Sequence, residues 1–186
     1  MKNEIESINM DDKHFIAIVL AAGQGKRMHS ETAKQYMNIH DKPMLYYSLK
    51  AFDESDVDEI IVVVGKEEIE YCKQNIIEKY SIKKECTVIA GGSERYNSVY
   101  QALEKIEGCS LNVGKERYVL IHDAARPMLT QSIIKETMKN VVKHKAVAVG
   151  VQSKDTIKVI NEEGVIDYTP KRRLTYVIQT PQAFEY

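Results

Sequence analysis

Short apolar runs alternate along this chain with amphipathic segments of helical spacing, and this alternation constrains the fold more than any other feature. Continuous apolar strands separated by helices indicate a mostly parallel sheet that is covered on both faces, so we predict a doubly wound α/β domain. Five runs predict strands, at residues 16–20, 59–64, 86–90, 117–121 and 146–151. Four segments between them predict helices, at residues 44–52, 66–80, 94–106 and 130–144.

The pattern changes after residue 152. Residues 155–160 and 165–169 predict two short strands, joined by a turn that ends in Gly164. A two-stranded ribbon alone is marginal in water, so it needs a partner surface, either in its own domain or on a second subunit. We therefore expect a protruding β-hairpin arm at about residues 153–175.

Length and composition exclude several classes of protein. The 186 residues suit a single domain, which we place at residues 15–186, after a flexible leader at residues 1–14 that mixes charges and resembles no secretory signal. No apolar run approaches the ~20 residues that span a bilayer. A formal net charge of −1 argues against a nucleic-acid partner. The three cysteines, Cys72, Cys86 and Cys109, have no disulfide or zinc-site spacing, which favours a cytoplasmic location.

A glycine-rich stretch, Leu20-Ala-Ala-Gly-Gln-Gly-Lys-Arg-Met28, directly follows the first predicted strand, where such turns commonly hold phosphate. A dinucleotide fingerprint would need a glycine at Met28, and a Walker loop would need Ser or Thr at Arg27. The loop therefore consists of small residues followed by Lys26 and Arg27, a composition that suits a nucleoside triphosphate. A glycine turn with solvated surface cations is an open alternative. The candidate phosphate-binding residues are Ala21, Ala22, Gly23, Gly25, Lys26, Arg27 and Lys34.

A second motif, His122-Asp-Ala-Ala-Arg-Pro127, ends the fourth predicted strand. Asp123 at that position can ligate a magnesium ion that bridges phosphates, or it can cap the following helix. Arg126 could pair with a phosphate or hold Asp123 in place. We interpret His122 as a packed histidine rather than a ligand.

A third motif, Gly91-Gly-Ser-Glu-Arg-Tyr-Asn-Ser98, closes the third predicted strand and opens a helix. Gly92 permits close backbone approach and Ser98 offers a hydroxyl one turn into the helix, so a base edge could be read here. The alternative is an ordinary helix N-terminus whose dipole Glu94 complements.

These motifs occur in a fixed order with three others, which are the stretches 33–36, 155–158 and 179–184. Taken together, the chain resembles the 2-C-methyl-D-erythritol 4-phosphate cytidylyltransferase family from Ile16 onward. Ribitol 5-phosphate cytidylyltransferases are the nearest competing family, but they tend to carry a different glycine loop and a valine in the second motif. The small residues at 21–23 and Ala125 favour the erythritol enzymes.

The resemblance implies a fold of the nucleotide-diphospho-sugar transferase type and a homodimer that forms through the arm. It implies a Mg²⁺-dependent reaction of CTP with a polyol phosphate, methylerythritol phosphate, in non-mevalonate isoprenoid synthesis. By similarity, Arg27 and Lys34 stabilise the reacting phosphorus, and Asp123 binds the metal. The residues that would contact CTP are Ala21, Ala22, Gly23, Gly25, Lys26, Gly92, Ser93 (where aspartate is frequent), Ser98 and Ala124. Those that would contact the sugar phosphate are Arg126, Thr156 and Arg172, the last two across the dimer interface.

Members of that family continue past the position of Tyr186 by about one βα unit, so we expect the C-terminal end of the domain to be missing here. Two hypotheses follow. The chain is an active cytidylyltransferase, or it is a non-catalytic, dimeric CTP-binding domain. Release of pyrophosphate distinguishes them, because both would bind CTP. A third reading, an NAD-dependent dehydrogenase, is disfavoured by Met28.

Overall fold

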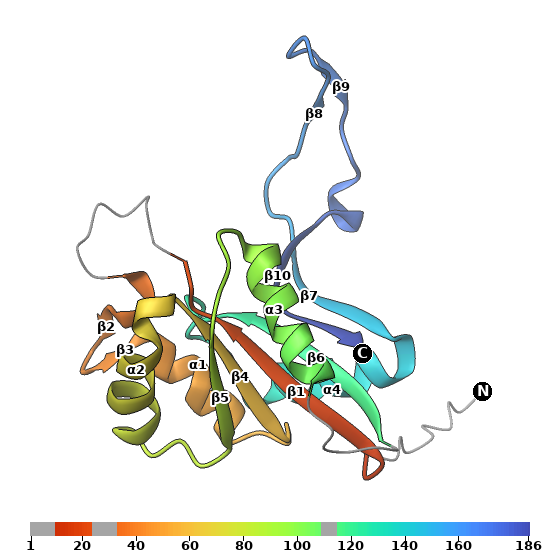
Figure 1. Cartoon of the computed structure of the whole chain (residues 1–186). Helices are drawn as coiled ribbons and strands as arrows, with labels where there is room; N and C mark the ends of the chain where they lie inside the picture. The colour runs from red at the N-terminus through yellow and green to blue at the C-terminus, as the bar shows by residue number, and fades with distance from the viewer. Residues whose placement is uncertain (1–9, 24–32, 109–114) are drawn as a thin grey trace.

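One six-stranded sheet organises the molecule (Figure 1). The computed structural model describes residues 10–23, 33–108 and 115–186. The strand order is β5–β4–β1–β6–β10–β7. Five strands run in one direction, and β10 is antiparallel to both of its neighbours, so the prediction of a mostly parallel sheet is confirmed. The bounds are β1 Lys13–Leu20, β4 Glu59–Val64, β5 Glu85–Ala90, β6 Glu116–Asp123, β7 Ala146–Gln152 and β10 Tyr176–Glu185.

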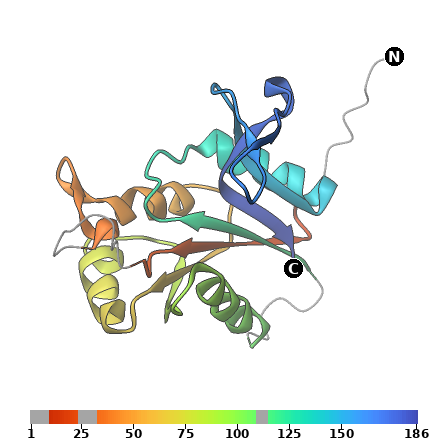
Figure 2. The ribbon, with the colours of Figure 1, turned by 90° about the horizontal axis from the view of Figure 1, so that it is seen from above.

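Helices cover both faces of the sheet (Figure 2), as the apolar runs predicted. Alternate residues of β1 serve two cores: Phe15, Ala17 and Val19 pack with one set of helices, whereas Ile16 and Ile18 pack with the other. Helix α3, Arg95–Glu107, lies on the second face. The first face carries α1, Met44–Asp53; α4, Gln131–His144; and the turns η3, Lys66–Glu68, α2, Ile69–Cys72, and η4, Lys73–Glu78.

Local sequence explains where these helices begin and end. Helix α1 starts directly after Pro43, whose fixed φ suits a helix start. Helix α4 is capped by Thr130, whose hydroxyl accepts a hydrogen bond from the Ile133 N–H at 3.3 Å. The segment predicted as one helix over residues 66–80 is helical, but it is built from 3₁₀, α and π turns and ends at Glu78.

The arm stands clear of the body between β7 and β10 (Figure 1). It consists of β8, Val159–Ile160, β9, Ile166–Tyr168, and the turn η5, Arg172–Leu174, so its strands are shorter than predicted. Gly164 takes the left-handed φ of 80° that the turn requires. The Asn161 carboxamide oxygen accepts the N–H groups of residues 163 and 165 and closes the turn.

A smaller hairpin, β2 Asn38–Ile39 with β3 Lys42–Pro43, follows the 3₁₀ turn η2, Lys34–Tyr36. Among the helices of the described ranges, none is long and apolar enough to cross a membrane.

Candidate active site

The three motifs of the sequence meet at one edge of the sheet, where the parallel strands end. Leu20, the last residue of β1, pairs in register with Asp123, the last residue of β6. The Ala124 N–H donates to the Leu20 carbonyl at 3.0 Å, and the Ala21 N–H donates to the Val63 carbonyl at 2.7 Å. The Gly91 N–H continues this edge by donating to the Val64 carbonyl at 2.7 Å. Ligands of open α/β sheets bind at such carboxyl edges.

The loop after β1 and the start of α3 touch at Gly91. A Cβ atom there would lie 2.5 Å from the Ala22 Cβ and 2.8 Å from the Ser98 hydroxyl, so only glycine fits. A Cβ on Gly92 would overlap the Asn97 side chain. Gly91 therefore lets the backbones of the two motifs come together at this edge of the sheet, and Gly92 lets the third motif turn tightly against its own helix.

The serines of the third motif hold the turn itself. Ser98 is buried, and its hydroxyl accepts from the Gly92 N–H at 3.2 Å and donates to the Glu94 carbonyl at 3.3 Å. The Ser93 hydroxyl is exposed and donates to the Asn97 carboxamide oxygen at 3.3 Å. Both serines were predicted to contact the nucleotide, and in this state their hydroxyls bind the protein.

Asp123 lies between two arginines. Its Oδ1 is 3.2 Å from Nε of Arg95, and its Oδ2 is 3.3 Å from Nε of Arg126. The helix-cap alternative does not apply, because Thr130 caps α4. Pairing with Asp123 was one of the two roles predicted for Arg126. Arg95 was not predicted as a site residue, although it lies in the third motif, at the first position of α3.

Strand β10 supplies acceptors for both guanidinium groups. Arg126 Nη1 donates to the side-chain oxygen of Gln179, and Arg95 Nη2 lies 3.5 Å from that of Gln182. Both arginine side chains remain more than two-fifths exposed, so they keep N–H donors available for an incoming anion. The stretch 179–184 was noticed as a motif, yet no role was predicted for its residues.

His122 is packed, as predicted, at 1% exposure. Its Nδ1 lies 2.9 Å from the Thr180 hydroxyl and its Nε2 lies 3.1 Å from the Arg126 carbonyl. Burial lowers the pKa of His122 to about 4, so the imidazole is neutral near neutral pH. Both ring nitrogens are occupied by the protein, which leaves neither to act on a substrate.

Lys34 is the first residue of the turn η2, and hydrogen bonds to Glu68 link this turn to Gly65 at the end of β4. Glu68 Oε2 accepts from the Gly65 N–H at 3.0 Å, from Gln35 at 3.4 Å and from the Tyr36 hydroxyl at 3.4 Å. Within the described ranges, no hydrogen bond or ion pair occupies the Lys34 ammonium. Gly25, Lys26 and Arg27 lie outside the described residues.

Thr156 and Arg172 are brought together on the arm. Arg172 Nη2 donates to the Thr156 hydroxyl at 2.9 Å. No hydrogen bond or ion pair of the described chain joins either residue to the Asp123 cluster. The arm follows the carboxyl end of β7, so it leaves the body from the same edge as the candidate site.

The candidate site offers a metal ion one carboxylate, that of Asp123. The described residues contain no group of three or more His, Cys, Asp or Glu that could hold an ion by itself. Mg²⁺ is usually bound through one or two carboxylates together with substrate phosphates, and the lone, one-third exposed Asp123 fits that mode.

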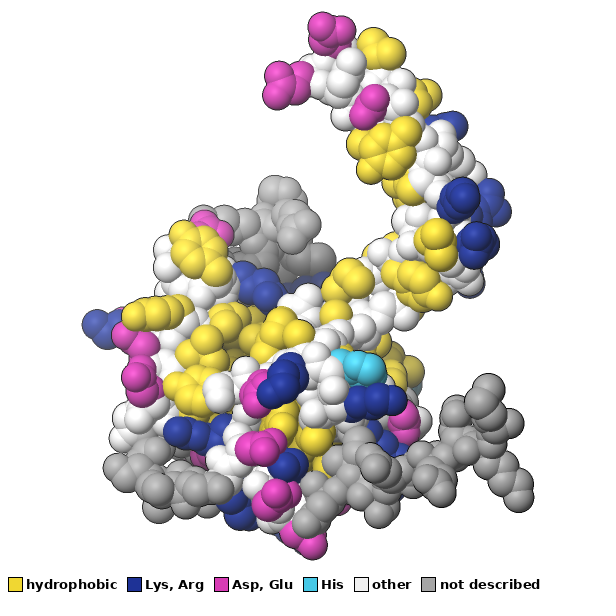
Figure 3. Space-filling view, turned by 90° about the vertical axis from the view of Figure 1, so that its right-hand side faces the viewer, with side chains coloured by type: hydrophobic (Ala, Val, Ile, Leu, Met, Phe, Trp, Pro, Cys, Tyr) yellow, Lys and Arg dark blue, Asp and Glu magenta, His cyan; other side chains and the backbone are white. Residues whose placement is uncertain are grey.

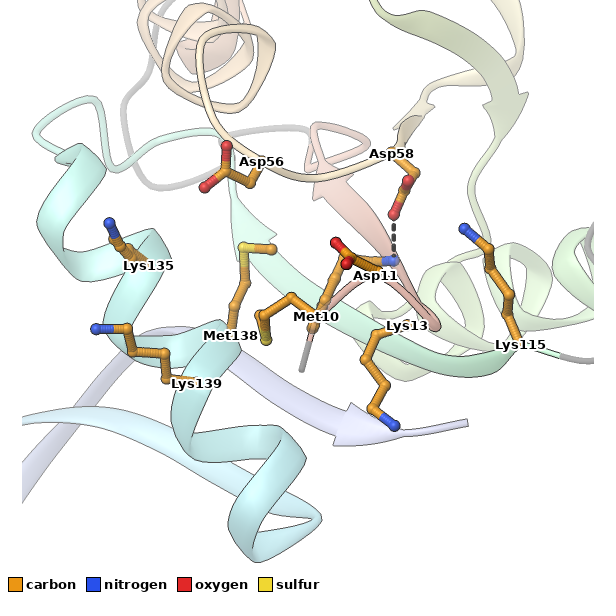
Figure 4. A pocket seen from close by; sticks show the side chains of 10 residues that line it. Met10, Asp11, Lys13, Asp56, Asp58, Lys115, Lys135, Met138 and Lys139 are labelled. Carbon is orange, nitrogen blue, oxygen red and sulfur yellow. Dashed lines mark hydrogen bonds between the residues drawn. The ribbon is translucent and has the colours of Figure 1, made fainter. Parts of the chain in front are cut away.

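A surface pocket lies at the opposite edge of the sheet, where β1 begins (Figure 4). It encloses about 370 Å³ and no predicted site residue lines it. Asp58, on its wall, accepts the Phe15 N–H at 2.7 Å, and Lys13 pairs with Asp12 and Glu116 at 3.1 Å each. The lining residues are Met10, Asp11, Lys13, Phe15, Asp56, Asp58, Lys115, Lys135, Met138 and Lys139.

Comparison with known proteins places the chain in one family. The family model described as 2-C-methyl-D-erythritol 4-phosphate cytidylyltransferase matches residues 15–186. A protein of that name from Lachnoclostridium phytofermentans is 54% identical over 170 residues, which cover 91% of this chain and 70% of the relative. Another, from Clostridium kluyveri, is 44% identical over 175 residues, covering 94% of this chain and 73% of the relative.

Solved structures agree with the sequence relatives. The crystal structure of 4-diphosphocytidyl-2C-methyl-D-erythritol synthase from Anaerococcus prevotii superposes with a TM-score of 0.78 at 33% identity. The match covers 95% of this chain and 71% of that one. A second structure of a synthase of the same name superposes with a TM-score of 0.72 at 26% identity, covering 93% and 74% of the two chains.

Proposed function

Since the chain belongs to the 2-C-methyl-D-erythritol 4-phosphate cytidylyltransferase family, we propose that the sheet edge around Asp123 is where it carries out the family's reaction. The enzyme transfers a cytidylyl group from CTP to 2-C-methyl-D-erythritol 4-phosphate in non-mevalonate isoprenoid synthesis. The products are 4-diphosphocytidyl-2-C-methyl-D-erythritol and pyrophosphate. The observation that carries the proposal is Asp123 held between Arg95 and Arg126, beside the close contact of Ala22 with Gly91.

The chemistry asks for charge stabilisation rather than a base. An oxygen of the substrate phosphate forms a bond to the α-phosphorus of CTP, and the bond from that phosphorus to the bridging oxygen of pyrophosphate breaks. The attacking phosphate is already ionised, so no proton must be removed. Lys34, Arg95 and Arg126 are the described cations that would approach the growing negative charge. Neutral His122 takes no part in proton transfer.

Binding of CTP would draw on the small-residue backbone. The backbone along residues 21–23 and 91–92 can approach a phosphate or a base closely, because no bulky side chain intervenes. The Ala21, Gly91 and Gly92 N–H groups already donate within the protein, so the candidate donors to phosphate are those of Ala22 and Gly23. Asp123 would hold Mg²⁺ together with the CTP phosphates, and the ion would supply neutralising charge across the triphosphate. Before that, the two arginines occupy both carboxylate oxygens, so CTP binding would shift at least one guanidinium from Asp123 to phosphate.

The arm would complete the site of a second subunit. Ile160, Val165, Ile166 and Tyr168 are each more than half exposed, and Figure 3 shows apolar side chains along the arm above the body. Such a surface needs a partner in water. We place Thr156 and Arg172, which are already joined on this arm, at the sugar phosphate of the partner subunit. A cytoplasmic location stays a prediction.

The test is pyrophosphate release from CTP and Mg²⁺ with methylerythritol phosphate, with ribitol 5-phosphate and with no acceptor. Release with methylerythritol phosphate alone is expected. Asp123→Asn and Lys34→Ala should each lower kcat by about 10²-fold or more. The exposed Glu136→Gln and Lys73→Ala serve as matched controls and should keep full turnover.

Binding of CTP without pyrophosphate release would support the non-catalytic alternative. Full turnover by Asp123→Asn would refute the placement of the site at this edge.

A further inference from the structure

We propose that Thr180 is a positioning residue for cytidylyl transfer: through His122 it holds the turn that presents Asp123 and Arg126. The proposal rests on the function proposed above for Asp123. Thr180 lies on β10, fifty-seven residues further along the chain than Asp123. It was not among the residues predicted from the sequence.

The Thr180 hydroxyl is bonded directly to the Asp123 end of that turn and, through His122, to the Arg126 end. Thr180 Oγ1 accepts the Asp123 N–H at 3.3 Å and lies 2.9 Å from His122 Nδ1. The other ring nitrogen of His122 lies 3.1 Å from the Arg126 carbonyl. The Arg126 N–H in turn donates to the Asp123 carbonyl at 3.0 Å. The backbone at residues 123 and 126 is therefore fixed by a single chain of hydrogen bonds.

The donors and acceptors allow one arrangement of protons in which every group is paired. A carbonyl only accepts, so His122 Nε2 carries the hydrogen that points to Arg126. In the neutral ring Nδ1 is then an acceptor, and the Thr180 hydroxyl donates to it while accepting from the Asp123 N–H. Thr180 is 9% exposed and His122 is 1% exposed, so water does not compete for these bonds.

The network holds the turn that carries the two charged groups of the proposed site. The carboxylate of Asp123 and the guanidinium of Arg126 stand at the two ends of the turn, 3.3 Å apart. Binding groups have to be held within about 0.5 Å of the productive geometry by residues behind them. Two nearby residues of β10 also hold the arginines in place: the Gln179 side chain accepts from Arg126, and the Gln182 side chain accepts from Arg95. Strand β10 thus places all three charged groups.

The experiment compares Thr180→Val, which keeps the shape and loses the hydroxyl, with Thr180→Ser, which keeps the hydroxyl. Mn²⁺ affinity in the presence of CTP, kcat and KM are measured for each. Thr180→Val should lose about 10- to 100-fold in Mn²⁺ affinity and in kcat, the range seen when partners of a metal ligand are removed. Thr180→Ser should stay within about threefold of the unchanged protein.

Thr137→Val is the matched control. Thr137 is another buried threonine, on α4, whose hydroxyl donates to the Ile133 carbonyl at 2.7 Å. Its substitution should lower the unfolding temperature without changing Mn²⁺ affinity. Equal losses in Thr180→Val and Thr180→Ser, or unchanged Mn²⁺ affinity in Thr180→Val, would overturn the proposal.

A spectroscopic readout covers the case in which Thr180→Val does not fold. Long-range ¹H–¹⁵N NMR of the unchanged protein should show His122 as the Nε2–H tautomer, and Thr180→Ser should preserve it. An Nδ1–H tautomer would overturn the proposal. If Asp123→Asn leaves Mn²⁺ affinity unchanged, the proposed metal role of Asp123 fails, while the tautomer still reports on the link between Thr180 and His122.

Discussion

Arg95 and Asp123 form an ion pair of 3.2 Å that joins the first residue of α3 to the last residue of β6. Both side chains are partly exposed, and exposed pairs contribute little to stability. The pair therefore matters mainly because it links the motif expected to read the nucleotide with the motif expected to bind its metal. It also holds the Arg95 guanidinium at the sheet edge where we propose that CTP binds.

We predict that Arg95→Ala weakens CTP binding while the fold stays intact. Loss of a charge-assisted contact to phosphate should raise the KM for CTP by about tenfold, with little change in unfolding temperature. Lys105→Ala, which removes a cation from the last turn of the same helix, is the control. Steady-state kinetics at two salt concentrations would check this, and an unchanged KM would exclude Arg95 from the nucleotide site.

Gly91→Ala should damage the site and Gly108→Ala should not. The added methyl group at Gly91 meets Ala22 and Ser98 below 3.0 Å, so the loop after β1 has to move. At Gly108 the nearest atoms are 3.7 and 3.8 Å away, which is ordinary contact. We expect weaker CTP binding for Gly91→Ala, and unchanged or slightly higher stability for Gly108→Ala. Calorimetric titration with CTP and thermal unfolding measure the two effects; equal behaviour of the variants would contradict the close packing at Gly91.

Asp53 gives a pH-dependent prediction about stability. Its side chain is 2% exposed, and its Oδ1 accepts the N–H groups of Lys83 and Lys84 at 2.8 and 2.9 Å. Burial alone would raise the pKa of Asp53, but these donors and the Lys50 ammonium outweigh it and hold the pKa below 3.8. The folded state thus gains stability above pH 3.8, and loses it as the pH falls through the folded pKa.

Asp53→Asn should accordingly lower the free energy of unfolding by about 1 kcal/mol near neutral pH. The difference from the unchanged protein should shrink in acid, below the unfolded pKa of 3.8. Urea unfolding at neutral pH and at about pH 3 tests both statements. Asp56→Asn, an exposed neighbour, should have no effect at either pH, and a pH-independent cost at Asp53 would show that its charge is irrelevant.

The arm gives a prediction about association. Ile166→Asp places a charge on a surface that is 56% exposed at this residue and that we expect a second subunit to cover. The variant should sediment as a monomer and turn over more slowly at low protein concentration. Glu162→Gln, in the turn at the arm's tip, should leave association unchanged. A monomeric unchanged protein would refute the dimer.

Most of the fold could be predicted because its strands are continuous apolar runs that end at turn residues. Strand β10 could not, since Pro181 and the polar residues at 179, 180 and 182 break both the apolar run and the period of two. Those polar side chains contact Arg126, His122 and Arg95. These contacts require polar residues at positions where a buried strand would otherwise have apolar ones. Asp123 and Arg126 lie in one sequence motif, so their proximity could be predicted. Arg95 is 28 residues from Asp123 in the chain, and only the arrangement of the strands brings the two side chains together.

The position of β10 sets an order for biogenesis. Strand β7 is made about one arm's length before β10, yet β10 is its hydrogen-bonded neighbour in the sheet. Until residues 176–185 are in place, no strand joins β6 to β7, because β10 is the strand that pairs with both. Asp123 and both arginines therefore gain their partners on β10 only when this last strand has joined the sheet.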